Sequence, residues 1–359
     1  MLKERRSGNA KARQPGSDHR RCVRTRVSLF RCQPRSRVPS SCRPYTSVTM
    51  TDPMPVDHVQ TKREIEQLLA DRGLHPRKRF GQHFLIDGNL MRRLADCAEL
   101  DADDTVLEVG AGTGGLTDLL AARAGKVICV EIDRDLLDIL SERFAENERV
   151  VLIEGDILTG KHALHPDVTA QIGGTRPLAI AVKLVANLPY QVATPLIMNL
   201  IVDYPQVRRL CFTVQLEVGE RITAAPGGKS FGPLAIISQA VCDIRTVARI
   251  SPQSFWPRPA VDSVMLRLDV TREPFADRDE LSSFAAFVRG VFEHRRKRLR
   301  AAAGYGLDRD LIERLGASFD LNRRPEQVPV SEWIQMFQTV GRSEPRPKGR
   351  GAEPVDAPR

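Results

Sequence analysis

The residues with the clearest chemical meaning form a glycine-rich turn, VLEVGAGTGG at positions 106–115, between an apolar run and a helical pattern. Glycines in such a turn let the backbone bend sharply and approach a ligand closely. Glu131 follows Gly110 by 21 residues, at the end of the next apolar run. A carboxylate at that offset can accept hydrogen bonds from both ribose hydroxyls of a nucleotide-like cofactor. The pair predicts a cofactor site that contains Gly110 and Glu131.

The turn alone does not identify the cofactor. Gly110, Gly112 and Gly115 also satisfy the G-x-G-x-x-G pattern of nicotinamide dinucleotide sites. Asp156 ends the third apolar run, where its carboxylate can accept a hydrogen bond from the amino group of an adenine ring. Asn187 ends the fourth run, so all these side chains are expected at the carboxyl edge of one sheet, where open α/β sheets bind ligands.

The tetrapeptide Asn187-Leu188-Pro189-Tyr190 has a specific chemical logic. The exocyclic amine of adenine is a poor nucleophile because its lone pair is delocalised into the ring. An Asn oxygen and a backbone carbonyl aimed at its two N–H groups would localise that lone pair. Pro189 fixes the backbone, and the Tyr190 ring offers a stacking face for an extruded base. Asn187 and Tyr190 are the expected catalytic residues, and no general base is required.

Elements with alternating character must position these side chains. Short apolar runs at 105–109, 126–131, 150–154, 178–186 and 210–214 alternate with helical patterns such as 116–123 and 136–144. This alternation predicts an α/β fold, a doubly wound parallel sheet covered by helices on both faces. The runs 240–250 and 263–270 are expected to form an antiparallel pair at the sheet edge. Only helical periodicity follows residue 274, which predicts a small C-terminal helical domain.

At this level of detail the chain resembles the small-subunit (16S) rRNA adenine N6,N6-dimethyltransferases, from about residue 77 to residue 341. The resemblance is carried by seven blocks in order: RFGQHFL at 79–85, the glycine turn, Glu131, Asp156, NLPY at 187–190, FWPRPAVDS at 255–263 and FEHRRKRLR at 292–300. It implies a Rossmann-like domain that uses S-adenosyl-L-methionine. The cofactor contacts that it implies fall on His83, Leu85, Gly110, Glu131, Asp156 and Asn187.

The resemblance also implies the biological setting. It points to dimethylation of two adjacent adenosines near the 3′ end of 16S rRNA during ribosome biogenesis, by a cytoplasmic monomer. Two positions depart from the family pattern. His83 stands where some members carry Asn, and Leu216 replaces a common lysine, which weakens one expected RNA or loop contact. The seven histidines show no metal-ligand spacing and the seven cysteines form no C-x-x-C pair, so no metal is expected.

The charge of the chain is unevenly distributed. Its formal net charge is +9, but residues 1–50 hold 13 Lys/Arg and only two Asp/Glu, while the remainder holds 41 and 43. The predicted organisation is a disordered basic extension at 1–60, a methyltransferase domain at 61–272, a helical RNA-contacting domain at 273–341 and a disordered tail at 342–359. The extension has three interpretations: a start codon assigned too early (Met50 and Met54 follow), an organellar transit peptide, or a functional tail.

Basic residues in the folded body form two clusters that could meet RNA phosphates. The first is Arg77-Lys78-Arg79, and the second is the run 295–300, which contains five Lys or Arg. The pattern places the second on a helix whose apolar stripe includes Val288 and Leu299. No run is long and apolar enough to cross a bilayer, so no membrane partner is expected.

Three other functions remain open from the residues. The first is a 23S rRNA adenine methyltransferase of the macrolide-resistance type, which would share the chemistry. The second is an NAD(P)-dependent oxidoreductase, which the glycine turn permits but the Asn187–Tyr190 segment does not explain. The third is a catalytically silent RNA-binding assembly or transcription factor, which the intact cofactor and catalytic segments argue against.

Overall fold

The computed structural model of the protein describes residues 59–160, 163–173 and 181–341. The tail at 342–359, most of the extension and residues 178–180 of one expected strand lie outside this range. Val59 and Gln60, assigned to the extension by sequence, are both buried. Val59 and Gln60 therefore belong to the folded body.

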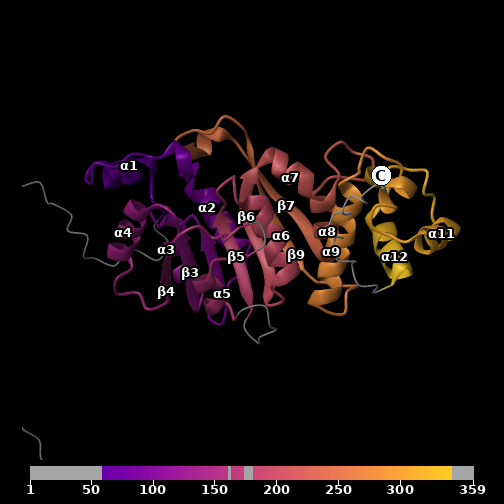
Figure 1. Cartoon of the computed structure of the whole chain (residues 1–359). Helices are drawn as coiled ribbons and strands as arrows, with labels where there is room; N and C mark the ends of the chain where they lie inside the picture. The colour runs from indigo at the N-terminus through magenta and orange to yellow at the C-terminus, as the bar shows by residue number, and fades with distance from the viewer. Residues whose placement is uncertain (1–58, 161–162, 174–180, 342–359) are drawn as a thin grey trace, which may run out of the picture. The chain divides into compact units, whose positions relative to one another are not determined.

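Seven strands form the main sheet in the order β4-β3-β2-β5-β6-β9-β7, and β1 pairs with β8 in a separate ribbon. Figure 1 shows β3 and β4 toward one side of the sheet and β7 and β9 toward the other. The strands are β1 Phe84–Leu85, β2 Thr105–Val109, β3 Lys126–Glu131, β4 Val150–Glu154, β5 Val182–Asn187, β6 Val207–Gln215, β7 Cys242–Ile250, β8 Phe255–Trp256 and β9 Ser263–Val270.

The pairing confirms the doubly wound parallel sheet. Strands β4, β3, β2, β5 and β6 are mutually parallel, and β9 is antiparallel to both β6 and β7. From β2 the chain winds outward through β3 to β4 and then returns to add β5 on the other side of β2. The order therefore reverses between β2 and β5, and ligands of such sheets bind at that switch point.

Helices cover both faces, because successive strand residues point to opposite sides. Val106 belongs to the hydrophobic cluster beneath α2 and α3, whereas Leu107 belongs to the cluster beneath α5, α6 and α8. The helices in this part are α1 Lys62–Ala70, α2 Gly88–Asp96, α3 Gly115–Ala121, α4 Arg134–Arg143, α5 Pro166–Gln171, α6 Ala193–Asp203, α7 Leu216–Ile222 and α8 Pro233–Val241.

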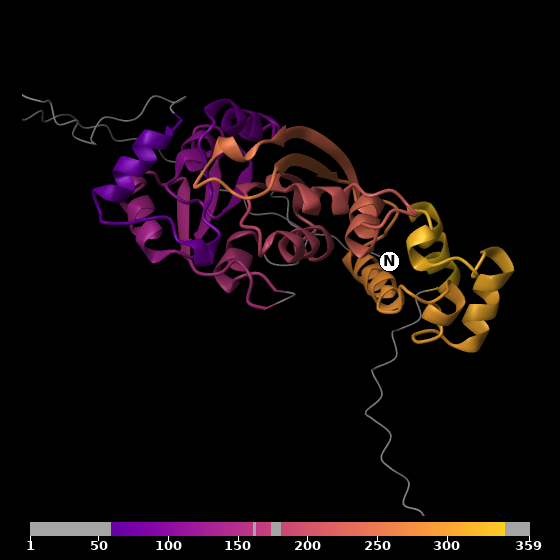
Figure 2. The same ribbon diagram turned by 90° about the horizontal axis from the view of Figure 1, so that it is seen from above.

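The C-terminal part is entirely helical in the described residues, with α9 Arg278–Phe292, α10 Leu299–Ala303, α11 Arg309–Ser318 and α12 Val330–Val340. Figure 2 shows these helices grouped at one end of the sheet. They pack on α6 and α8, and Phe284, Trp333 and Phe337 share one hydrophobic cluster with strand residues such as Leu107. The division of the chain at 272/273 stays a proposal from the sequence.

Two local expectations differ from the structure. The run 295–300 is not helical at its start: α9 ends at Phe292, and a turn leads to α10 at Leu299. Ala240 and Val241 belong to α8 and not to the strand that was expected from residue 240. The antiparallel pair expected at the sheet edge is confirmed: β9 joins β6, and β7 pairs with β9 as the outermost strand. Short apolar runs do not distinguish a buried helix end from a strand.

Candidate active site

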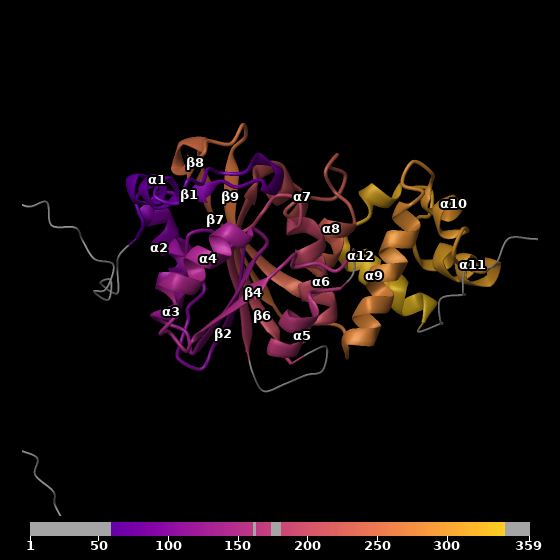
Figure 3. The same ribbon diagram turned by 60° about the vertical axis from the view of Figure 1, so that its left-hand side comes forward.

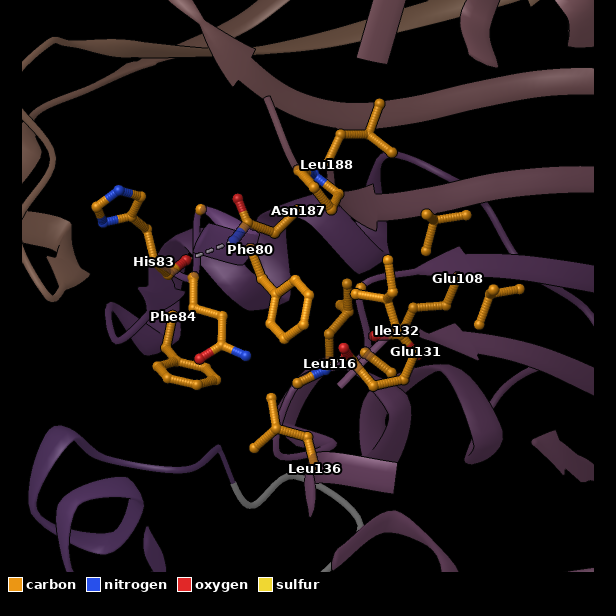
Figure 4. A pocket seen from close by; sticks show the side chains of 18 of the residues that line it. Phe80, His83, Phe84, Glu108, Leu116, Glu131, Ile132, Leu136, Asn187 and Leu188 are labelled. Carbon is orange, nitrogen blue, oxygen red and sulfur yellow. Dashed lines mark hydrogen bonds between the residues drawn. The ribbon is translucent and has the colours of Figure 1, made fainter. Parts of the chain in front are cut away.

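One pocket lies at the switch point, above the carboxyl ends of β2, β3 and β5. Figure 4 shows it from close by, and Figure 3 shows the short β1–β8 ribbon beside α1. All seven residues that the sequence proposes as catalytic or cofactor-binding line this pocket: His83, Leu85, Gly110, Glu131, Asp156, Asn187 and Tyr190. They come from segments that lie up to about a hundred positions apart in the sequence.

The glycine turn is confined on two sides. Gly110 has a φ of 75°, and a Cβ atom there would lie 3.0 Å from Cγ of Pro189. Gly112 has a φ of 62°, and a Cβ atom there would lie 3.0 Å from the Phe84 ring. A side chain at either position would therefore be strained and crowded. The turn after β2 packs directly against the Asn187–Tyr190 segment, which brings the two predicted sites together.

Two backbone N–H groups hold the carboxylate of Glu131 in place. Its Oε2 accepts a hydrogen bond from the Gly112 N–H at 2.9 Å, and its Oε1 accepts one from the Asp133 N–H at 3.0 Å. Burial raises the pKa of Glu131, while these two backbone donors lower it. Each carboxylate oxygen keeps a further lone pair for a ribose hydroxyl. The arrangement fits the role proposed from the sequence.

The adenine end of a cofactor would meet Asp156 and Ile132. Asp156 lies exposed at the pocket edge, where its Oδ1 accepts a hydrogen bond from the Leu158 N–H at 2.9 Å. Ile132 directly follows Glu131 and is 44 % exposed, which is unusual for a large apolar side chain. Figure 4 shows it beside Glu131. An apolar wall, an edge carboxylate and a ribose-binding carboxylate together fit the adenosyl group of S-adenosyl-L-methionine.

Asn187 is clamped from two sides. Its Nδ2 donates to the backbone oxygen of His83 at 2.8 Å, and its Oδ1 accepts a hydrogen bond from Thr213 Oγ1 at 2.5 Å. Figure 4 shows the first of these contacts. Sequence reasoning placed Asn187 but did not identify Thr213, which lies 26 residues away on β6. The strand register, in which Asn187 pairs with Thr213, explains their contact.

His83 and Tyr190 form an aromatic pair next to Asn187. Their ring centroids lie 5.8 Å apart with an interplanar angle of 29°. The Nδ1 atom of His83 lies 2.6 Å from the Pro257 carbonyl oxygen, which can only accept, so Nδ1 carries the proton. The hydroxyl of Tyr190 lies 3.3 Å from Ser263 Oγ. The backbone oxygen and Nδ1 of His83 are therefore both engaged within the protein, and Nε2 is the ring atom left for a ligand.

Arg77 has a different role from the one expected. The sequence predicts that it contacts RNA phosphates together with Lys78 and Arg79. In the structure its guanidinium pairs with both Asp133 and Asp135 at the start of α4. Gln82 also donates to Asp133, at 2.7 Å. These contacts tie the segment before β1 to the start of α4. Lys78 and Arg79 are exposed, whereas the guanidinium of Arg77 is already paired with the two carboxylates.

Glu108 is a pocket-lining residue to which sequence reasoning gave no role. It is buried beneath the glycine turn, where its Oε2 accepts a hydrogen bond from Thr117 Oγ1 at 2.7 Å. Burial raises the pKa of Glu108 to about 8. The folded protein thus retains a proton on this carboxyl that the unfolded chain releases near pH 4.3. Stability is therefore lost as the pH rises through that interval.

We expect Glu108→Gln to raise the melting temperature at pH 8, because the amide removes the cost of a buried titrating acid. The advantage should shrink toward pH 5, where Glu108 is already neutral. Thermal unfolding of the variant and the parent at both pH values measures this. An equal difference in melting temperature between variant and parent at pH 5 and pH 8 would show that the pKa of Glu108 is not raised.

The second basic cluster lies at the C-terminal helices, on the turn between α9 and α10. Arg295, Arg296, Lys297 and Arg298 are all exposed. Arg295 makes one long hydrogen bond, 3.4 Å to the backbone oxygen of Lys229. Within the part of the chain that the structure describes, none of the four forms an ion pair. The same part contains no group of three His, Cys, Asp or Glu side chains that could hold a metal, and no helix long and apolar enough to span a membrane.

Comparison with known proteins gives consistent relationships. The chain matches the family model "Ribosomal RNA adenine dimethylase" over residues 73–341. It is 38 % identical over 288 residues to Ribosomal RNA small subunit methyltransferase A of Moorella thermoacetica, covering 79 % of this chain and 99 % of that one. It is 36 % identical over 270 residues to the protein of the same name from Alkaliphilus metalliredigens, covering 73 % of this chain and 91 % of that one.

Solved structures share the fold. A dimethyladenosine transferase from Plasmodium falciparum superposes with a TM-score of 0.59 at 22 % identity, over 72 % of this chain and 98 % of that one. The 23S rRNA methyltransferase ErmE gives a TM-score of 0.51 at 24 % identity, over 72 % and 99 %. The sequence match spans both the sheet with its pocket and the C-terminal helices. The chain belongs to the ribosomal RNA adenine dimethylase family, and it is an S-adenosyl-L-methionine-dependent methyltransferase.

Proposed function

We propose that the protein dimethylates the exocyclic amines of two adjacent adenosines near the 3′ end of 16S rRNA during small-subunit biogenesis. The observation that carries the proposal is the junction of two sites in one pocket. The Asn187–Tyr190 segment, suited to an adenine amine, packs directly on the glycine turn beside Glu131. The curated relatives at 36–38 % identity are small-subunit methyltransferases, which supports this substrate.

The residues of the pocket divide the chemical work. S-adenosyl-L-methionine, when bound, supplies a methyl group on a positively charged sulfur. Glu131, Asp156 and Gly110 would hold it, with the ribose against the carboxylate of Glu131. Asn187 Oδ1 keeps one lone pair for an N–H of the target amine, since Thr213 uses the other. This contact helps localise the lone pair of the amine toward the methyl group.

Tyr190 would hold the target base in place. Its ring already stacks on His83, and its hydroxyl is positioned by Ser263, so the exposed part of the ring is fixed before a base arrives. Pro189, packed on Gly110, prevents the backbone from rotating. The methylated amine is a strong acid in its cationic form and loses its proton to water. No side chain in the pocket needs to act as a base.

The substrate and setting extend this proposal. The exposed cations on the turn between α9 and α10, with Lys78 and Arg79, supply a positively charged surface for rRNA phosphates. We place the enzyme in the cytoplasm, as a monomer acting on rRNA within a small subunit or its precursor. The runner-up substrate is 23S rRNA, which the fold shared with ErmE permits.

Methyl transfer to purified subunits distinguishes these substrates. Labelled S-adenosyl-L-methionine is incubated with small subunits that lack adenine dimethylation and, separately, with large subunits. We expect label in the small-subunit RNA alone. Label confined to large-subunit RNA would assign the enzyme to the 23S type.

The basic extension should be dispensable for catalysis. A chain that begins at Met50 retains Val59 and Gln60, which are buried in the body, so we expect unchanged cofactor affinity and unchanged activity near physiological salt. The 13 cations of residues 1–50 add a salt-sensitive attraction to any phosphate backbone, so RNA binding should weaken at low salt. Methylation assays on both chains at two salt concentrations measure this. A truncated chain that is inactive at both would make the extension part of the enzyme.

A further inference from the structure

An aromatic pair joins the basic turn between α9 and α10 to the residues just after α10. The rings of His294 and Tyr305 are stacked, with centroids 3.6 Å apart and an interplanar angle of 22°. Tyr305 is 66 % exposed, the most exposed large apolar residue in the described chain. Because Tyr305 stays largely exposed while stacked on His294, part of its ring is available to a ligand.

The charges beside this pair are of one sign. The segment 293–300 contains five Lys or Arg and a single acid, Glu293. Arg296, Lys297 and Arg298 are exposed and make no ion pair within the described residues. Neutralising partners for these cations are therefore missing from the parts of the protein that the structure shows. An anionic partner would supply them.

We propose that the His294–Tyr305 pair and the cations of 295–298 form a second RNA contact, remote from the methyl-transfer pocket. An unpaired base stacks on the exposed part of the Tyr305 ring, and the cations bind the neighbouring phosphates. Aromatic rings next to cations bind single-stranded nucleic acid in this way, because every base offers a stacking face. This inference rests on the proposed rRNA substrate and adds a site to it. A protein partner is disfavoured, since the four residues that follow His294 are all exposed cations.

Binding of short RNAs tests the stacking. A fluorescein-labelled single-stranded 12-mer and the duplex of the same sequence are titrated with full-length protein at physiological salt. We expect Tyr305→Ala to weaken binding of the single strand by about tenfold and binding of the duplex by less than twofold. Tyr305→Phe should bind both RNAs like the parent. Arg296→Ala should weaken both RNAs and reduce the salt dependence of binding.

The outcomes separate this site from the proposed function. Equal binding of the single strand by Tyr305→Ala and the parent would overturn the stacking site. If the parent methylates small subunits and Tyr305→Ala binds both RNAs like the parent, the proposed function stands and only this inference fails. Loss of activity on assembled subunits with unchanged binding of both RNAs would point to a protein contact and would likewise overturn it.

A separate observation concerns the orientation of the Asn187 amide. The backbone oxygen of His83 can only accept, so the atom of Asn187 that faces it must be the NH₂ group. Oδ1 therefore faces Thr213, whose hydroxyl must donate to it. Thr213 is 1 % exposed and pairs with Asn187 in the strand register, so its position is fixed by the sheet. The two contacts together prevent the amide from flipping.

We infer that Thr213 is a positioning residue for methyl transfer, acting through Asn187. Without its hydroxyl, the amide is held at one end only, and Oδ1 is no longer kept in line with the target amine. Thr213→Val keeps the shape of the side chain and removes the hydroxyl, whereas Thr213→Ser keeps the hydroxyl. Thr105→Val, another buried threonine in the same sheet but away from the pocket, is the matched control.

Single-turnover kinetics measure the effect. We expect Thr213→Val to lower the rate by about tenfold with an unchanged dissociation constant for S-adenosyl-L-methionine. Thr213→Ser should restore most of the rate, and Thr105→Val should behave like the parent. A normal rate in Thr213→Val would overturn the inference, as would a loss that Ser does not restore. If Asn187→Ala also retains activity, the failure lies with the proposed catalytic site and not with Thr213 alone.

Discussion

Asn187→Ala is expected to lower the rate of methyl transfer by about 10²–10³, with the fold intact. The change removes the oxygen that would face the target amine and leaves Thr213 Oγ1 and the His83 backbone oxygen without their partner. Asn187 also lines the cofactor pocket, so a smaller loss of cofactor affinity accompanies the loss of rate.

Single-turnover methylation at saturating cofactor isolates the chemical step in this variant. Circular dichroism and thermal unfolding report on its fold. Asn89→Ala, at an exposed position on α2, is the control and should keep the full rate. A folded Asn187→Ala protein with a near-normal rate would place the methylation centre elsewhere.

Glu131→Ala should raise the dissociation constant of S-adenosyl-L-methionine by roughly tenfold or more. A hydrogen bond to a charged group contributes about 1.5–3 kcal/mol, and the carboxylate has an oxygen for each ribose hydroxyl. Loss of the acceptor also frees the Gly112 N–H, which loosens the turn against which the cofactor would lie. The effect should fall on affinity more than on the rate at saturation.

Isothermal titration calorimetry measures this affinity directly. Glu146→Ala removes an exposed acid outside the pocket and should bind like the parent. An unchanged dissociation constant in folded Glu131→Ala would refute the placement of the ribose. The two variants are expected to differ. Asn187→Ala mainly lowers the rate of methyl transfer, and Glu131→Ala mainly weakens binding of S-adenosyl-L-methionine.

The sequence predicts the sheet well because its central strands, such as β2 and β3, are buried on both faces. Such strands are short, nearly continuous apolar runs, and the ends of 105–109, 126–131, 150–154 and 263–270 agree with the structure. The wrong expectation for 295–300 has a physical cause. Leu299 continues the apolar spacing of α9, but the chain turns at 293–298 and α10 begins a new axis. Hydrophobic periodicity does not reveal that one helix has ended and another has begun when no Pro or Gly lies between them.

The candidate site follows from one rule, that side chains at the carboxyl ends of parallel strands meet at one sheet edge. Glu131, Asp156 and Asn187 are placed by that rule alone. Thr213 and the pairing of Arg77 with α4 are not predicted, since each depends on contacts between segments far apart in sequence. Ile132, which also lines the pocket, is not predicted either. Ile132 alone had a local signal, as an apolar residue just beyond the end of a strand.

The most direct test of methyl transfer at Asn187 is nucleoside analysis of rRNA. Small subunits that lack adenine dimethylation are incubated with S-adenosyl-L-methionine and either the parent enzyme or Asn187→Ala, and the digested RNA is examined by mass spectrometry. We expect N6,N6-dimethyladenosine in the small-subunit RNA with the parent and almost none with the variant. A parent that forms no dimethyladenosine there, or a variant that forms as much as the parent, would contradict the proposed enzyme.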